Sequence, residues 1–232
     1  MREIIFDTET TGLNPAGGDR MVEIGCIEIF NRVETGRHFH AYFNPDRDMP
    51  SEAEAVHGLT GIFLSSKPRF AEQAEELLAF IADSPLIAHN ASFDFGFLNF
   101  ELEHCGRPAV CLSRMVDTLG LARTRHPGAK HSLDALCVRF GIDRSHRVKH
   151  GALLDAQLLA QVYVELTGGR QIGLGLVADA NDGSVRPADR PVVLREPLAP
   201  RPHSAAPEEL ERHAAFIARL VNPLWARVAA AG

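Results

Sequence analysis

The order in which hydrophobic periodicities follow one another is the feature that most restricts the fold of this chain. Residues 2–6, Met21–Phe30 and residues 38–43 have the alternating or apolar patterns of strands, and short turn-like segments separate them. Longer segments with helical periodicity follow, with one short apolar strand inserted among them. Strands joined by short turns favour an antiparallel meander, and strands followed by helices with inserted strands favour an α/β fold on a mixed sheet.

The later elements can be placed individually. Gly106 and Gly168 each follow a segment of helical periodicity and suit a helix end. Ser132 suits the start of another helix, because its hydroxyl can accept a hydrogen bond from a free backbone N–H group. The pattern therefore predicts a short buried strand at Leu86–Ala88 and helices over Phe70–Ile81, 92–104, 133–140 and Ala152–Leu166.

Composition excludes several classes of protein. The 232 residues are 45% hydrophobic and 23% charged, as in ordinary globular proteins. No apolar run approaches the roughly 20 residues that span a bilayer, and the acidic N-terminal segment is unlike a signal peptide. The four cysteines form no CxxC pair and fit reduced thiols. We therefore expect a cytoplasmic protein that makes no contact with a membrane.

Charge is distributed unevenly along the chain. The 24 basic and 30 acidic residues give a net charge of −6. Residues 168–232 hold eight arginines and seven acids, so residues 1–167 hold 16 basic and 23 acidic residues and carry −7. An acidic domain does not attract a polyanion by bulk electrostatics. If this domain handles nucleic acid, bound cations or a partner must supply the attraction.

Two acids lie at the end of the first predicted strand. Asp7 and Glu9 are separated by Thr8, so both carboxylates lie on one face of the strand. Neighbouring carboxylates disfavour each other's charge, and a divalent cation relieves that cost. A solvated strand end is the alternative, because a single DxE pattern often has no function.

Two further motifs place polar groups at element ends. Asp94 lies in the first turn of a predicted helix, where an acid also stabilises the helix dipole. Asp155 lies among leucines on a later helix and needs a partner if buried, and His150 precedes that helix. Separately, Asp94 can be a helix-capping acid and His150 a surface histidine. Together, four carboxylates and a histidine fit a two-metal hydrolytic site in which the histidine takes the proton of the attacking water.

The motifs FDTETTG, HNASFD and HGALLD, in this order and spacing, resemble those of the DEDDh exonuclease superfamily. Their surroundings over residues 1–167 resemble the proofreading epsilon-subunit (DnaQ) family of bacterial DNA polymerase III. The resemblance implies a ribonuclease H-like α/β fold, with a mixed five-stranded sheet and helices on both faces. It also implies a subunit of the bacterial replisome that removes mismatched nucleotides 3′→5′ from the primer end and releases nucleoside 5′-monophosphates.

The resemblance implies roles for individual residues as well. Asp7 would bridge two metal ions, Asp94 would act partly through water, and His150 would be the general base. The two ions would be Mg²⁺ or Mn²⁺, and their ligands would be the four acids of the motifs: Asp7, Glu9, Asp94 and Asp155.

Residues 51–60 are similar to a segment that, in the epsilon family, lies beside the 3′-terminal nucleotide. There an acid and a histidine lie five residues apart, and Glu52 and His57 match that spacing. Ser51 followed by Glu54 also predicts a capping box, which would begin a short helix. The residues expected to contact substrate are therefore Asp7, Thr8, Glu9, Glu52, His57 and Asp155.

Beyond an exonuclease domain expected over residues 1–169, the composition changes. Six of the 14 prolines lie from Pro187 to Pro207, which predicts a flexible, extended linker over residues 170–206. Within it, the segment from Gln171 to Leu176 is similar to glutamine-led peptides that dock on bacterial sliding clamps.

Residues 207–232 are expected to form a helical tail, with helical periodicity from Pro207 to Trp225 and with Pro223 ending or kinking the helix. One narrow apolar seam on this helix needs a covering partner, which in the epsilon family is the polymerase (alpha) subunit. A helix folded back on its own domain is the alternative. The seam consists of Leu210, Ala214, Ile217, Val221 and Leu224.

Two other functions remain open on sequence alone. A free-standing DEDDh exonuclease that trims RNA would carry the same motifs. A catalytically silent scaffold would use the domain only to brace a polymerase. The long tail disfavours the first alternative, and the intact set of acids with His150 disfavours the second.

Overall fold

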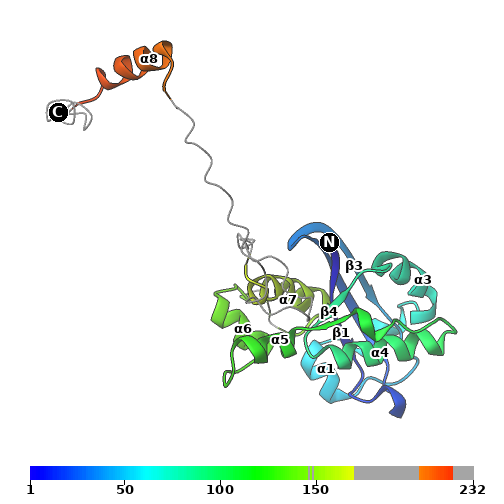
Figure 1. Ribbon diagram of the computed structural model, residues 1–232. Helices are drawn as coiled ribbons and strands as arrows, with labels where there is room; N and C mark the ends of the chain where they lie inside the picture. Colours follow the sequence, from blue (N-terminus) through cyan, green and yellow to red (C-terminus); the bar gives the residue numbers. More distant parts are fainter. Residues whose placement is uncertain (146, 148, 170–203, 222–232) are drawn as a thin grey trace, which may run out of the picture. The chain divides into compact units, whose positions relative to one another are not determined.

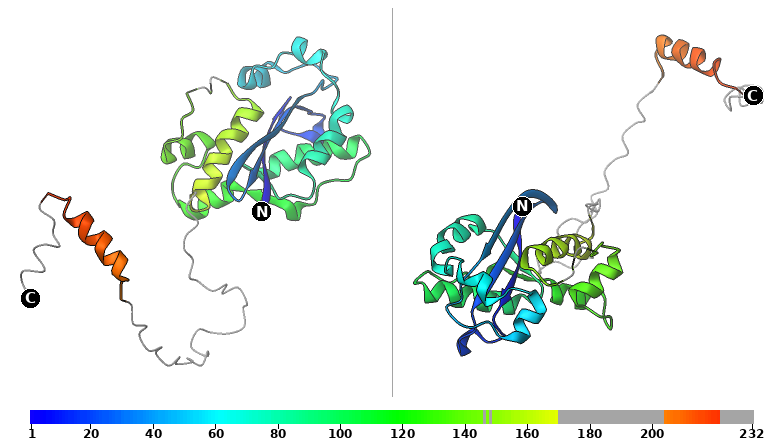
Figure 2. Two further views of the ribbon diagram at one scale, coloured as in Figure 1. Left: turned by 90° about the horizontal axis from the view of Figure 1, so that it is seen from above. Right: turned by 180° about the vertical axis from the view of Figure 1, so that it is seen from behind.

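The computed structural model describes residues 1–145, 147, 149–169 and 204–221. The chain divides into two units, Met1–Leu176 and Val177–Gly232. In the first unit, helices cover both faces of one five-stranded sheet (Figures 1 and 2). This arrangement confirms the α/β fold expected from the sequence.

The sheet combines an antiparallel half with a parallel half. Its strands have the order β3-β2-β1-β4-β5; β1, β2 and β3 pair antiparallel, whereas β4 and β5 are added in parallel. The expected meander is confirmed, although β1 and β3 are longer than predicted and β5 was not predicted. The strands are β1 (Arg2–Thr10), β2 (Met21–Phe30), β3 (Val33–Tyr42), β4 (Leu86–Ala88) and β5 (Met115–Asp117).

Most helices of the first unit follow the predicted pattern. The bounds of α3 and α7 agree with the sequence prediction, and Ser132 caps α6 by accepting a hydrogen bond from the Ala135 N–H group. Two short helices, α2 and α5, were not predicted. The helices are α1 (Ser51–His57), α2 (Gly61–Ser65), α3 (Phe70–Ile81), α4 (Ala91–His104), α5 (Thr118–Arg125), α6 (Leu133–Phe140) and α7 (Ala152–Leu166).

The predicted capping box at the start of α1 is wrong. Pro50, with extended backbone angles, is the residue before the first helical turn, and no side chain caps this end. Ser51 is already helical, and its hydroxyl lies 3.3 Å from a Glu52 carboxylate oxygen. Because the helix begins one residue earlier than the pattern required, Glu54 lies one position too far along to close a capping box.

Each face of the sheet has its own apolar core. On one face, Phe6 of β1 packs with residues of α3 and α4, including Phe95. On the other, Ile5 of β1 packs with Leu159 and Tyr163 of α7. Figure 2 shows α7 on one side of the sheet and α3 and α4 on the other. The alternation of β1 therefore assigns each of its side chains to one helical layer.

Gly25 of β2 allows α7 to approach the sheet closely. A Cβ atom at this position would lie 2.3 Å from the backbone nitrogen of Leu153, so no larger residue fits without moving the helix. Gly25 is also the residue of β2 that pairs with Asp7 of β1. The start of α7 is thereby held beside the acidic end of β1.

In the second unit, the described residues form the helix α8 (Pro207–Ile217). Pro207 begins this helix as predicted, and the Ala206 N–H group donates to a Glu209 carboxylate oxygen at 3.0 Å. The prediction that the helix continues through residues 218–221 is wrong, since it ends at Ile217.

Parts of the sequence predictions lie outside the described residues. These parts are residues 170–203 of the expected linker, the clamp-like segment from Gln171 to Leu176, and the seam residue Leu224. Of the seam residues that are described, Leu210 is 56% exposed and Val221 is 93% exposed. None of the described helices is long and apolar enough to cross a membrane.

Candidate active site

The three sequence motifs converge on one cavity of about 260 Å³. The end of β1, the start of α4 and the start of α7 each contribute polar side chains to it. All six motif residues singled out in the sequence line this cavity: Asp7, Thr8, Glu9, Asp94, His150 and Asp155. The structure therefore brings together the proposed metal ligands and the proposed base.

Alternation along β1 decides which way the acids point. Asp7 and Glu9 lie two and four residues after Ile5, so their side chains point to the same face of the sheet as the Ile5 side chain. Because Ile5 packs against α7, both acids lie on the α7 face. The Thr8 side chain points to the opposite face of the sheet, and its hydroxyl donates to Asp94 Oδ1 at 2.8 Å. One strand end thus reaches the acids of both neighbouring helices.

Three groups are close enough together to hold a metal ion. One ligand atom each from Glu9, His150 and Asp155 lie within 4.8 Å of one another. Glu9 is 8% exposed and Asp155 is 3% exposed, so their carboxylates have little water to stabilise them. The carboxylate oxygens of this trio are the hard ligands that Mg²⁺ and Mn²⁺ prefer. Asp7 and Asp94 line the same cavity but are not part of this trio.

The acids disfavour one another's charge in this arrangement. Burial, followed by the nearby carboxylates Asp94 and Glu9, raises the pKa of Asp7 well above its usual range. Burial and then the charge of Glu23 raise the pKa of Glu9 to about 8. Burial also raises the pKa of Asp94 to about 7, although the Thr8 hydroxyl opposes the shift. A divalent cation would remove this repulsion, so the residues fit a metal site.

Arg147 also belongs to this cavity, and the sequence analysis did not assign it a role. Its guanidinium group donates to both carboxylate oxygens of Asp155, from Nε at 2.5 Å and from Nη2 at 2.6 Å. Nη1 donates to Asp134 Oδ1 at 3.0 Å. The only sequence signal was the basic character of the segment before His150, which does not reveal these partners.

A second cavity, of about 470 Å³, lies beside the acids and contains both residues of the 51–60 segment. Glu52 and His57 line it together with Glu9 and Phe93. The Leu59 N–H group donates to His57 Nδ1 at 3.0 Å, so the histidine proton is on Nε2. Nε2 is buried and has no hydrogen-bond partner of normal geometry within the described part of the chain.

Another acid pair behind the site was not predicted. Glu23 of β2 pairs with Glu9 across the sheet, and Glu23 Oε1 lies 2.7 Å from His40 Nε2. Glu23 is 3% exposed, which explains its strong effect on the pKa of Glu9.

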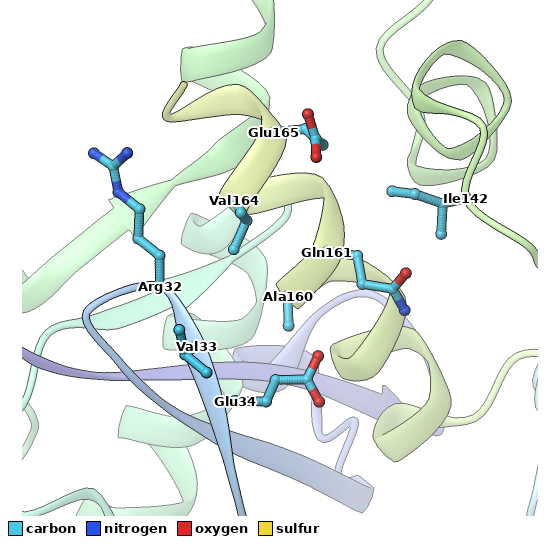
Figure 3. Close-up of a pocket in the computed structure, with 8 residues that line it drawn as sticks. All are labelled: Arg32, Val33, Glu34, Ile142, Ala160, Gln161, Val164 and Glu165. Carbon is cyan, nitrogen blue, oxygen red and sulfur yellow. The ribbon is translucent and has the colours of Figure 1, made fainter. Parts of the chain in front are cut away.

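Another cavity, of about 700 Å³, lies away from the acids (Figure 3). It is formed by the turn between β2 and β3 and by the second half of α7, and Arg32, Glu34 and Gln161 line it. Neither the four acids nor His150 contributes to its lining. Its size alone does not connect it with the chemistry of the acids.

Comparison with known proteins identifies the class of this protein. Residues 4–163 match the model of the RNase T family, which is described as Exonuclease, so the chain is an exonuclease of this class. DNA polymerase III subunit epsilon of Rickettsia typhi is 48% identical over 232 residues, which cover 95% of this chain and 97% of that protein. The Escherichia coli subunit epsilon is 47% identical over 176 residues, covering 73% of this chain and 72% of that protein. The chain belongs to the family of DNA polymerase III epsilon subunits.

Solved structures agree with this assignment. Exonuclease X in complex with 5′-overhanging duplex DNA has a TM-score of 0.56 at 26% identity, covering 71% of this chain and 90% of that chain. The nuclease domain of 3′hExo, a DEDDh family member bound to rAMP, has a TM-score of 0.62 at 15% identity. The match covers 72% of this chain and 91% of that chain. The second likeness concerns the fold alone. Together they support the expected DEDDh exonuclease fold.

Proposed function

We propose that this 3′→5′ exonuclease proofreads for a replicative DNA polymerase in the bacterial cytoplasm. It would remove mismatched nucleotides from the primer end and release nucleoside 5′-monophosphates. The observation that carries the proposal is the convergence of all three acidic motifs, with His150, on one cavity. The names of the full-length relatives support the assignment to a polymerase.

Two divalent ions, Mg²⁺ or Mn²⁺, are proposed as the cofactors. Asp7, Glu9 and Asp155 would hold the first, Asp7 would also hold the second, and Asp94 would complete the site partly through water. When bound, such ions stabilise negative charge on the attacking and leaving oxygens of a phosphodiester. The raised pKa values of Asp7, Glu9 and Asp94 support the assignment, since burial and neighbouring carboxylates disfavour the charged forms of these acids and a divalent cation would offset that cost.

His150 is proposed as the general base that takes the proton of the attacking water. It precedes α7, lines the same cavity as the acids, and its side chain is 49% exposed. That exposure gives the ring access to water, which a base acting on a water molecule needs. Thr8 would hold Asp94 in place through its hydroxyl.

Glu52 and His57 are proposed to bind the terminal nucleotide, together with Asp7, Thr8, Glu9 and Asp155. The cavity that they share adjoins the acids, because Thr8 and Glu9 line both cavities. His57 offers an Nε2–H donor that has no partner of normal geometry in the described residues, and a buried donor of this kind is stabilised by a ligand acceptor. The His57→Ala variant should therefore weaken binding of a nucleoside 5′-monophosphate by about tenfold and leave metal affinity unchanged.

Preference for mismatched ends is proposed to come from fraying. An unpaired terminal nucleotide enters a cavity more cheaply than a paired one, because no base pair is broken. The acidic domain has little electrostatic attraction for DNA of its own, so the polymerase would hold the primer nearby. Activity should therefore be higher on a mismatched primer than on a matched one, and higher in the complex than alone.

The helix α8 is proposed to bind the polymerase alpha subunit. Leu210 and Phe216 are large apolar side chains on this helix, which the surface of a partner would bury. Ala214→Glu, on the seam, should weaken the complex at least about tenfold. Ala215→Glu, one residue further along and about 100° around the helix, lies off the seam; it is the matched control and should bind normally. Equal affinity of both variants would show that the seam makes no contact.

The segment from Gln171 to Leu176 is proposed to dock on the sliding clamp, on its sequence resemblance alone. Replacing Gln171 and Leu176 by alanine in the full chain should reduce its affinity for the clamp. Unchanged clamp affinity in this double variant would show that the segment does not bind the clamp.

One assay separates proofreading from its alternatives. The full chain, with and without the polymerase, is given matched DNA, mismatched DNA and RNA in the presence of Mg²⁺ or of a chelator. Proofreading predicts metal-dependent shortening of mismatched DNA that the polymerase accelerates. Preference for RNA would indicate a trimming exonuclease, and no hydrolysis under any condition would indicate a scaffold.

A further inference from the structure

Arg147 is the strongest polar partner in the cavity that the proposed mechanism does not use. Its side chain is only 10% exposed, and it makes a two-pronged ion pair with Asp155. Paired N–H groups of a guanidinium match the two oxygens of a carboxylate, which makes this one of the stronger ion-pair geometries in proteins. Arg147 therefore has a defined position at the acids.

This position overlaps with the groups that converge on a metal. Of Glu9, His150 and Asp155, Arg147 contacts two at hydrogen-bond distance, because its Nη2 also lies 2.8 Å from His150 Nδ1. Its charge also reaches the third, since it lowers the pKa of Glu9 against the stronger effects that raise it. The guanidinium thus supplies positive charge to two of the proposed metal ligands, Glu9 and Asp155, and contacts the proposed base His150.

A second anchor is available to Arg147 outside the acid cluster. Its Nη1 lies 3.0 Å from Oδ1 of Asp134, whose side chain is 46% exposed. Arg144 pairs with the same carboxylate oxygen at 2.7 Å but makes no described contact with Asp155. Arg147 can therefore leave Asp155 and still keep an ion pair at the rim of the cavity.

We propose that Arg147 is an exchangeable internal cation, which binds Asp155 in the metal-free protein and gives that carboxylate up when a divalent cation binds. The same exchange would release His150 Nδ1 from the guanidinium. Arg147 would act through Asp155 and His150, so it is a positioning residue. This inference rests on the proposed function, because it takes Asp155 to be a metal ligand.

The test compares two variants of the full chain that each remove one positive charge paired with Asp134. Arg147→Gln also removes the contact with Asp155, whereas Arg144→Gln does not. Mn²⁺ affinity is measured without substrate, and the thermal midpoint is measured in chelator. We expect Arg147→Gln to bind Mn²⁺ about tenfold more tightly and to have a lower midpoint in chelator, because Asp155 loses its partner. Arg144→Gln should change Mn²⁺ affinity by less than about twofold.

A measurement on the unaltered chain keeps the proposal testable if Arg147→Gln does not fold. The Nε–H resonance of Arg147 is assigned by its loss in Arg147→Lys, and Mg²⁺ is then titrated. We expect this resonance to shift or broaden as the metal binds, while the Arg144 resonance stays largely unchanged. A resonance that Mg²⁺ leaves unmoved would overturn the proposal.

The outcomes also separate this inference from the proposed function. If the unaltered chain binds no divalent metal, the proposed metal site itself fails. If it binds metal and Arg147→Gln binds with equal or lower affinity, then only the exchange fails. Lower affinity in that variant would mean that Arg147 supports the metal site instead of competing for it.

Discussion

Two helices complete the acid cluster, and they treat their carboxylates differently. Asp155 of α7 and Asp94 of α4 are both 3% exposed, so burial does not distinguish them. Asp155 is paired with the guanidinium of Arg147, whereas Asp94 accepts a hydrogen bond from the neutral hydroxyl of Thr8. Charge is therefore balanced at the start of α7 and left unbalanced at β1 and α4. The difference teaches that one cluster can be stabilised on one side and still attract cations on the other.

The largest effect should come from removing an acid of the unbalanced side. Asp7→Ala should reduce the rate of DNA hydrolysis by about 10⁴-fold, because the proposed ligand of both metal ions is lost. Its thermal midpoint in chelator should rise, since repulsion among the remaining acids is relieved. Asp155→Ala should be equally inactive but should have a lower midpoint, because it leaves Arg147 without its main partner. Equal changes of thermal midpoint in both variants would contradict the claim that Asp155 is charge-balanced by Arg147 and that Asp7 is not balanced.

His150→Ala should follow, with a loss of about 10³-fold in rate. The variant should retain its fold, because the side chain is half exposed, and it should still bind Mn²⁺ through the acids. Rates measured across neutral pH check the role directly. An unchanged rate with the same pH dependence would show that another group takes the proton.

A smaller loss should follow from moving α7 without touching any acid. Gly25→Ala places a Cβ atom 2.3 Å from the Leu153 backbone nitrogen, so the helix must shift relative to β1. Because Asp155 moves with it, the rate should fall about 100-fold. Gly96→Ala is the matched control, since a Cβ atom there meets nothing within 4 Å, and its rate should be normal. Normal activity of Gly25→Ala would mean that the position of α7 is not critical.

The smallest effect concerns pH and the Thr8 hydroxyl. The pKa values of Glu9 and Asp94 in the folded chain are about 8 and about 7, raised from 4.5 and 3.8. Stability from such groups is fully present below the unfolded-state pKa and is lost as pH rises through the folded-state pKa. The midpoint in chelator should therefore fall between about pH 4 and pH 8, and added Mg²⁺ should reduce the fall.

The Thr8→Val variant tests whether Asp94 contributes to this pH dependence of the thermal midpoint. The hydroxyl lowers the pKa of Asp94, so its removal should raise that pKa and shift the pH dependence upward. Activity near neutral pH should fall by less than about tenfold, since no proposed metal ligand is lost. Thermal scans of both chains in chelator provide the check. Identical pH dependence would mean that Asp94 is not the group titrating.

The sequence was most informative where one periodicity continues over a whole element. The bounds of β2, α3 and α7 were predicted correctly, because their apolar residues face a core on a regular spacing, and β4 was predicted because all three of its residues are apolar. The helices α2 and α5 and the strand β5 are short, and the partly buried residues of β5 give no clear alternation. Short elements of this kind depend on tertiary contacts more than on local pattern.

The residues of the site also fall into those that local sequence pattern predicted and those that it did not. The four acids and His150 were predicted because each lies in a motif of fixed spacing, and the fold does bring them into one cavity. Arg147 and Glu23 were not predicted, because their roles depend on partners in distant segments. Arg147 reaches Asp155 only when α7 is docked, and Glu23 meets Glu9 only across paired strands.

The most direct test of the account is hydrolysis of a 5′-labelled, mismatched DNA primer by the unaltered chain and by Asp7→Ala, with Mg²⁺ or with chelator. The account predicts stepwise shortening from the 3′ end and release of nucleoside 5′-monophosphates by the unaltered chain with Mg²⁺. It predicts no shortening in chelator or in the Asp7→Ala variant. Comparable shortening by Asp7→Ala, or shortening in chelator, would contradict the claim that these acids hold the metal for exonuclease action.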